Sequence, residues 1–250
     1  MHAPPCHILP PCVIMSESMN AVIDLLERPL YSMPQVDRLL ALPPRTAKRW
    51  IDGYQRRGRL YDPVIRLEPT GDEIVTWGEF VEARFLAEYR TKGVPMVRMR
   101  PAIMELRKEF GKYPLAHARP FVDGKELVLK VQEAVGLERA LVMVVVRSGQ
   151  LMLSDAANHF LQSVEYGSDD DPIVHRIHPL TGNHTVVVDP LRQFGEPVVR
   201  SVPTAVIAEL FDAGDSVESI ADLYELERDD VEAALRYERE RIKSQNPTAA

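Results

Sequence analysis

Three cations, Arg45, Lys48 and Arg49, are spaced so that a helix would carry them on one outer face, with the hydroxyl of Thr46 beside them. Guanidinium and ammonium groups contact phosphate oxygens, and threonine hydroxyls donate hydrogen bonds to the same atoms. We therefore interpret these four residues as candidates for contact with a nucleic-acid backbone.

Residues 30–53 form the helix-turn-helix pattern that would position this face. Ser32 and Gln35 make a capping box, which predicts the start of a first helix. Pro44 suits the first position of a second helix, which Gly53 would end. A short helix pair with a basic second helix is the geometry that enters a major groove. An ordinary helical hairpin with solvated charges would show the same pattern.

The charge of the chain is unevenly distributed. The net charge is −7 over 250 residues, which by itself argues against a nucleic-acid partner. Residues 31–60, however, carry seven Lys or Arg against two Asp, whereas residues 209–240 carry twelve Asp or Glu against three Arg. One end of the protein suits phosphate and the other end repels it.

The segment after the second helix is predicted to form a wing. Residues 63–67 alternate like a short strand, residues 68–71 contain a turn signal, and residues 73–75 return as a second strand. Arg66 lies on the first of these strands. It therefore joins the candidate DNA contacts.

Two longer helices should follow the wing. Thr76 and Glu79 form a second capping box, for a helix that runs to Lys92 and stops at the next glycine. Pro101 begins another helix, which Gly111 ends.

Residues 30–111 resemble the winged helix-turn-helix of the MerR-like regulators. The order is a helix pair, a two-stranded wing and a second helix pair joined by Gly93-Val94-Pro95. Pro43 stands where that family usually has a Ser or Thr cap, so the second helix loses a side-chain cap. No long dimerising coiled coil and no cysteine cluster follow, so the sensor half of that family is absent.

The middle of the chain has β character. Phe121–Val131 contains Asp-Gly between strand-like runs and is predicted to be a hairpin. Leu141–Val146 is interpreted as a buried strand and Leu151–Phe160 as a short helix. Val164–Tyr166 and Ile173–Ile177 alternate around a loop and suggest a second hairpin.

Metal and catalytic sites are not predicted. The run Asp169–Asp171 could bind a cation, but a solvated turn explains it more simply because no further ligands are spaced around it. His175 and His178 should point to opposite faces of one strand and not share an ion. The opening residues hold four donors whose spacing matches no closed zinc module: His2, Cys6, His7 and Cys12. We expect no cofactor and no enzymatic activity.

The C-terminal part contains three predicted helices. The first runs from about Pro203 to Ala213, Asp215 and Glu218 cap the second, and Glu227 opens the third, which runs past Arg241. The last two have the shape of a helix-turn-helix. Their carboxylates would repel DNA, because phosphate attraction supplies most of the binding free energy.

This end resembles a small helical domain of unknown function found in many bacterial antitoxins. The matching pieces are Val-Val-Val-Asp-Pro190, Phe-Gly-Glu-Pro-Val-Val-Arg200 and the acidic helices that follow them. With the basic domain in front, the chain resembles a VapB-type antitoxin of the mycobacterial kind. The resemblance implies a PIN-domain ribonuclease toxin as partner, neutralisation by complex formation, and autorepression of the operon.

The resemblance also suggests toxin-binding residues at the chain's end. PIN-type nucleases hold carboxylates for magnesium, and an inserted arginine can pair bidentately with such a group. Arg239 and Arg241 are the candidates, because they follow the last apolar positions of the third helix. Attraction of cations to a helix C-terminus would also explain these arginines.

The predicted fold is α+β. We expect a disordered extension at 1–18, a MerR-like winged helix-turn-helix at 19–112, an α+β middle region at 113–184, and a helical antitoxin-type domain with a C-terminal tail at 185–250. The predicted function is an antitoxin that binds operator DNA and its toxin as a homodimer or toxin–antitoxin hetero-oligomer. The alternative is a stand-alone MerR-like regulator that senses a ligand in the middle region. A cytoplasmic location is expected, since no signal peptide or membrane-length apolar run is recognisable.

Overall fold

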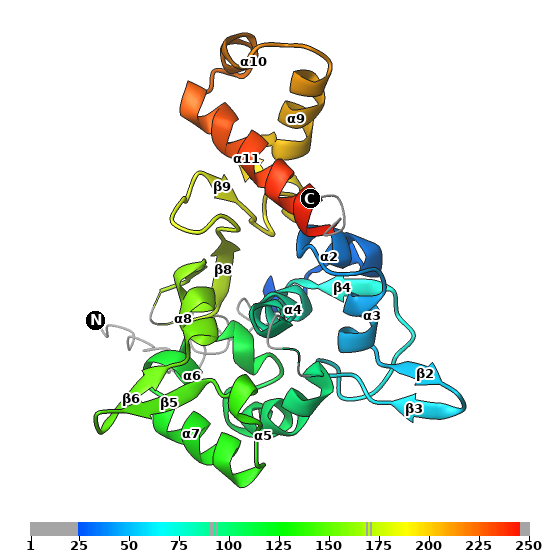
Figure 1. The fold of residues 1–250 in the computed structure, drawn as a ribbon, viewed down its shortest axis with the longest axis vertical. Helices are drawn as coiled ribbons and strands as arrows, with labels where there is room; N and C mark the ends of the chain where they lie inside the picture. The colour runs from blue at the N-terminus through cyan, green and yellow to red at the C-terminus, as the bar shows by residue number, and fades with distance from the viewer. Residues whose placement is uncertain (1–24, 91–92, 94, 169, 171, 246–250) are drawn as a thin grey trace, which may run out of the picture.

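The computed structural model describes residues 25–90, 93, 95–168, 170 and 172–245. The predicted extension at 1–18 lies outside the described residues. The fold is α+β, as predicted, with helices and short antiparallel strands along the described chain (Figure 1). None of the described helices has the length and apolar character needed to cross a membrane.

The first part of the fold surrounds the predicted helix-turn-helix. Its elements are β1 (Pro29–Ser32), α2 (Met33–Leu39), α3 (Thr46–Ile51), β2 (Tyr54–Arg56), β3 (Arg59–Tyr61), β4 (Ile74–Thr76) and α4 (Trp77–Tyr89). Strand β1 pairs antiparallel with β4, and β2 pairs with β3 as a separate hairpin. Both predicted capping boxes, at Ser32 and at Thr76, are confirmed.

The predicted wing was wrong in its position along the chain. Residues 63–67 form no strand; Val64 and Ile65 are buried, and their N–H groups donate to the Trp50 carbonyl at 2.7 and 2.9 Å. The alternation at 63–67 therefore reflects packing against the end of α3. The hairpin lies earlier, where Arg57 and Gly58 both have positive φ, as a tight two-residue hairpin turn requires.

The middle region mixes helices with two hairpins. It contains α5 (Arg100–Phe110), α6 (Arg119–Val122), α7 (Lys125–Ala134), β5 (Val144–Arg147), β6 (Gln150–Leu153), α8 (Asp155–Gln162), β7 (Val164–Tyr166) and β8 (Val174–Ile177). Single 3₁₀ turns are η2 (Met96–Met99), η3 (Pro114–Ala116) and η4 (Arg139–Leu141). The predicted helix from Pro101 to Gly111 and the predicted β7–β8 hairpin are confirmed.

Three predictions for the middle region are corrected by the structure. Phe121–Val131 spans the end of α6 and most of α7 instead of a hairpin, and Val128 and Gln132 of α7, four residues apart, face the same interior. The Gln132 amide accepts N–H groups of Met143 and Val144, and it donates to the Val144 carbonyl at 2.5 Å. The predicted strand within 141–146 begins only at Val144, and a second strand, β6, occupies the first residues predicted as helix.

The C-terminal part packs three helices on a small sheet. Its elements are β9 (Val186–Val187), η5 (Gln193–Gly195), β10 (Val198–Val199), β11 (Val202–Pro203), α9 (Thr204–Asp212), α10 (Val217–Tyr224) and α11 (Arg228–Gln245). The three predicted helices are confirmed. The cap of α10 is Ser216, whose hydroxyl accepts the Ser219 N–H at 3.1 Å, and not the predicted Asp215.

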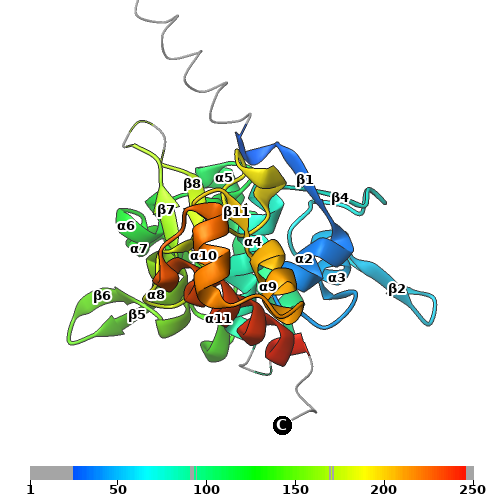
Figure 2. The same cartoon turned by 90° about the horizontal axis from the view of Figure 1, so that it is seen from above.

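The described chain has two apolar cores joined by polar contacts. The larger core gathers aromatic side chains of α4, α6 and α8, and the smaller one lies among α9, α10 and α11. The Tyr31 hydroxyl donates to the Gly195 carbonyl at 2.8 Å, and any Cβ at Gly195 would collide with that hydroxyl. Arg38 donates to both oxygens of Glu196 at 2.6 and 2.9 Å. Figure 2 shows α9, α10 and α11 gathered over the rest of the molecule.

A carboxyl group, Glu82 of α4, is fully buried in the larger core. Its oxygens accept the Leu115 N–H at 3.2 Å and Arg107 Nη2 at 3.3 Å. Burial raises the pKa of Glu82 to about 7, and the nearby Arg107 guanidinium opposes that rise only in part. Glu82 therefore changes charge near neutral pH.

We predict that this group makes the protein less stable as pH rises. Because the folded pKa exceeds the usual value of 4.5, the folded state holds more protons between pH 4.5 and 7. The free energy of unfolding should fall across that window, by at most about 3 kcal/mol from this group, and then level off. In Glu82→Gln, urea titrations at successive pH values should lose this component. Glu109→Gln, an exposed change on α5, is the control. An equal pH dependence in both variants would contradict the assignment.

Candidate nucleic-acid interface

The N-terminus of α3 is capped from the neighbouring helix. No side chain of α3 itself, within the described chain, caps its first turn, where Arg45 has a left-handed backbone. Asp37 of α2 instead accepts the N–H groups of Arg45 at 2.6 Å and Ala47 at 2.7 Å. Burial raises the pKa of Asp37, and these N–H groups oppose the rise. The expected loss of a cap at Pro43 is therefore compensated by Asp37.

The predicted cations of α3 lie on its outer side. Arg45 and Arg49 are exposed, and Lys48 is partly exposed and paired with Glu73. Arg49 donates to the Arg45 carbonyl at 3.1 Å and to Thr46 Oγ1 at 2.9 Å. The prediction that Thr46 faces outward was wrong. Thr46 is only 6% exposed, and its hydroxyl accepts a hydrogen bond from Arg49 within the helix. It orients a cation rather than facing outward.

The structure also places Arg66 differently from its predicted position on the wing, because its side chain is only 9% exposed. Its guanidinium donates to Glu79 Oε1 at 2.7 Å and to Asp52 Oδ1 at 3.0 Å. It also donates to the backbone carbonyls of Asp72 at 2.9 Å and Ile74 at 2.7 Å. Arg66 therefore connects the end of α3 to the start of α4 and is not among the solvent-facing cations.

The β2–β3 hairpin carries three exposed cations that the predicted contact set missed: Arg56, Arg57 and Arg59. The hairpin projects from the body of the molecule beside α3 (Figure 1). Tyr54 and Tyr61 stack across it with ring centroids 4.6 Å apart, and the Arg59 guanidinium lies 5.4 Å from the Tyr61 centroid. The cluster of arginines around Gly58 was the available sequence signal.

Together, α3 and the hairpin present what we call the basic face: Arg45, Lys48, Arg49, Arg56, Arg57 and Arg59. Cations on a helix and on an adjacent projecting hairpin can contact phosphates on both sides of a groove. Such contacts give sequence-independent affinity that falls with salt. Base recognition would require side chains of α3 to reach the groove edge.

The two predicted toxin-binding arginines lie on α11, which is more firmly packed than expected. Tyr237 is 6% exposed, and the Thr204 hydroxyl donates to Glu238 at 2.6 Å. Arg241 donates to Glu238 through Nε at 2.9 Å, and its side chain is 14% exposed. Arg239 is exposed, with its guanidinium 5.7 Å from the Phe211 ring centroid. The assumption that both follow the packed part of the helix was wrong for Arg241.

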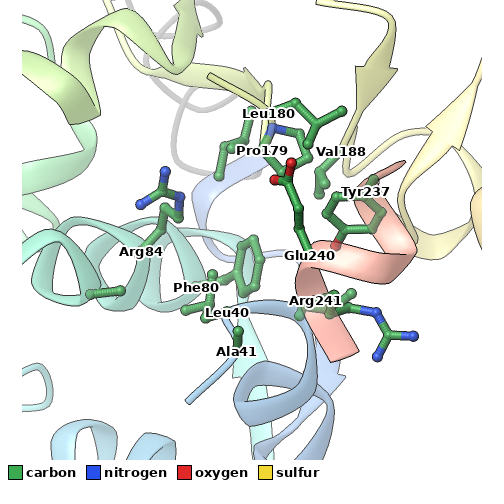
Figure 3. Close-up of a pocket in the computed structure, with 13 residues that line it drawn as sticks. Leu40, Ala41, Phe80, Arg84, Pro179, Leu180, Val188, Tyr237, Glu240 and Arg241 are labelled. Carbon is green, nitrogen blue, oxygen red and sulfur yellow. The ribbon is translucent and has the colours of Figure 1, made fainter. Parts of the chain in front are cut away.

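A cavity of about 170 Å³ lies where α11 meets α2 and α4. Figure 3 shows Tyr237, Glu240 and Arg241 of α11 near Phe80 of α4 and near Leu40, which directly follows α2. Ile177 of β8 and the following Pro179 and Leu180 also line it. The cavity therefore lies where the helix-turn-helix, the end of the middle region and α11 meet.

Comparison with known proteins supports both ends of this description. Residues 29–103 match the family model "Putative DNA-binding HTH domain", and residues 186–237 match "Protein of unknown function (DUF433)". "Uncharacterized protein Rv2308" of Mycobacterium tuberculosis is 40% identical over 225 residues, which are 87% of this chain and 93% of that protein. "Putative antitoxin VapB45" of the same organism is 32% identical over 224 residues, 83% of this chain and 92% of that protein. The crystal structure of Rv2018, also from M. tuberculosis, has a TM-score of 0.68 and 30% identity, covering 83% of this chain and 97% of that chain.

Proposed function

The chain belongs to the antitoxin-like family that joins a putative DNA-binding HTH domain to a DUF433 domain, and we propose that it binds operator DNA through its basic face and represses its own operon. The observation that carries this proposal is the concentration of exposed cations on α3 and the β2–β3 hairpin of an acidic chain. The DNA-binding domain and the antitoxin-like relative indicate a non-enzymatic regulator.

In this proposal the N-terminal part, about residues 19–112, is a MerR-like winged helix-turn-helix. The order of α2, α3, a hairpin and the helices α4 and α5 supports it. Helix α3 has six residues and is therefore about 9 Å long. So short a helix reaches only a few base edges, so we propose that two copies bind neighbouring half-sites, as a homodimer or within a larger complex.

Loss of single cations from the basic face should weaken DNA binding and flatten its salt dependence. For Lys48→Ala and for Arg57→Ala, the slope of log affinity against log salt should decrease by about one unit each, because each change removes one phosphate contact. Fluorescence anisotropy with DNA from upstream of the gene, repeated at several salt concentrations, measures both quantities.

The matched control for this titration is Lys130→Ala. Lys130 is an exposed lysine on α7, which lies away from the hairpin in Figure 1. It changes the net charge equally but should leave the salt slope unaltered. If all three variants behave alike, only general charge matters and the basic face is not the contact surface.

We further propose that the chain neutralises a PIN-domain ribonuclease toxin, as the VapB-type resemblance implies. Support comes from the relative named as an antitoxin and from the exposed guanidinium of Arg239 on α11. A guanidinium can pair bidentately with a carboxylate of a magnesium site and so compete with the metal. In this proposal Arg239 makes the inhibitory contact, while Arg241 holds α11 together through Glu238.

We also propose limits for the two domains that follow the winged helix-turn-helix. The α+β middle region is at 113–184, and the antitoxin-type domain is at 185–250.

The antitoxin proposal predicts that binding and inhibition can be separated. The Arg239→Ala variant, co-expressed with the protein of the adjacent reading frame, should still bind that protein. The bound protein should, however, recover part of its ribonuclease activity. Arg236→Ala, an exposed change one turn earlier on α11, is the control. Pull-down measures binding, and cleavage of labelled RNA measures inhibition. Full silencing by Arg239→Ala would place the inhibitory contact elsewhere.

A second candidate is a stand-alone regulator that responds to a small ligand. The cavity among α2, α4 and α11 favours it, because a ligand there would touch both the helix-turn-helix and the C-terminal helices. The absence of any toxin activity in the adjacent reading frame would favour this candidate over the antitoxin.

A further inference from the structure

Three donor residues that are distant in sequence meet beside the β7–β8 hairpin. Glu165 belongs to β7, His178 directly follows β8, and His184 lies in the loop that leads to β9. One ligand atom from each, a carboxylate oxygen and two imidazole nitrogens, lies within 4.8 Å of the other two. Two imidazoles and a carboxylate are the donor set of many three-ligand zinc sites.

The contacts within this cluster leave its ligand atoms facing one another. His178 Nε2 lies 2.6 Å from Glu165 Oε1, and the rings of His178 and His184 are 4.4 Å apart at 67°. Arg176 lies against the other carboxylate oxygen, Glu165 Oε2, at 3.4 Å, and it also pairs with Asp189. Oε1 is thus directed toward the His178 imidazole, which in turn contacts the His184 ring.

Burial also distinguishes this cluster from a chance surface contact. The His178 side chain is 4% exposed, and its Nδ1 atom has no hydrogen-bond partner among the described residues. The contact of Nε2 with Glu165 is therefore the hydrogen bond that orients the His178 ring. His184 is exposed and leaves the cluster open to solvent, which provides an entry path for an ion and for a water ligand.

We propose that Glu165, His178 and His184 bind a zinc ion, with water as the fourth ligand. Zinc–ligand distances of about 2.0–2.1 Å in a tetrahedral arrangement separate ligand atoms by about 3.3 Å. His178 Nε2 and Glu165 Oε1 need to move apart by less than 1 Å from their present 2.6 Å. Imidazole ligands favour zinc over magnesium or calcium, which prefer oxygen.

The position of this site suggests what the ion stabilises. Ile177 belongs to the larger apolar core, whereas Leu180 and Val186 belong to the smaller one. His178 and His184 lie in the segment that passes from one core to the other. The ion would therefore link this segment to β7, which carries Glu165. Zinc binding would then stabilise the connection between the two cores, independently of whether the chain binds DNA or a toxin.

The test is a zinc titration of the full chain in a background that lacks the N-terminal donors: His2→Ala, Cys6→Ser, His7→Ala and Cys12→Ser. Competition with a chromophoric chelator gives stoichiometry and affinity. The proposal predicts one zinc ion per chain. His184→Ala and Glu165→Gln should each weaken binding about tenfold or more, in line with the sensitivity of metal sites to their ligand shell. His159→Ala, which removes an imidazole outside the cluster, should not.

Thermal unfolding separates a metal ligand from a merely structural residue. Zinc should raise the melting temperature of the background protein, because an ion that binds the folded state stabilises it by mass action. It should not do so for His184→Ala. Failure of the background protein to bind zinc would overturn the proposal. Equal zinc affinity in the background protein and His184→Ala would overturn it as well.

Discussion

The buried guanidinium of Arg66 is the interaction on which the arrangement of the N-terminal part depends. It pairs with Asp52, which ends α3, and with Glu79, which caps the start of α4. Asp52 also accepts the N–H groups of Thr70 and Gly71. Burial alone would raise the pKa of Asp52, but the Thr70 N–H and Arg66 outweigh it and hold that pKa below its usual value. The carboxylate therefore stays ionised and keeps its partners.

This network fixes where the basic face is presented. The β2–β3 hairpin begins two residues after Asp52, so the anchor of α3 is also the anchor of the hairpin. Removal of one member of a buried ion pair costs about 3–5 kcal/mol, because the remaining charges stay buried without compensation. Some acids in the described part of this region point inward, where they cap helices and pair with arginines. They are Asp37, Asp52, Glu79 and Glu82. Their inward placement leaves cations to dominate the outer side of α3 and the hairpin.

Local signals in the sequence predicted much of this fold. The capping boxes at Ser32 and Thr76 each involve residues three positions apart, so they are visible without tertiary information. The Asp123-Gly124 signal failed because Gly124 packs against Phe110 and opens α7, a contact that depends on α5.

The candidate site was predictable only where it followed from helix periodicity. Arg45, Lys48 and Arg49 could be placed outward from the spacing of α3 alone. Arg66 could not be assigned to the interior, because its partners come from α3, α4 and the loop between them. The cluster of Glu165, His178 and His184 was likewise hidden, because a strand and a loop bring it together.

We propose that α3 and the β2–β3 hairpin together form the surface that contacts DNA. Hydrogen–deuterium exchange of the full chain, with and without a duplex from upstream of its gene, tests it most directly. We expect slower exchange on DNA binding in residues 46–61, with exchange in α7 unchanged. DNA binding that slows exchange elsewhere and leaves residues 46–61 unaffected would contradict it.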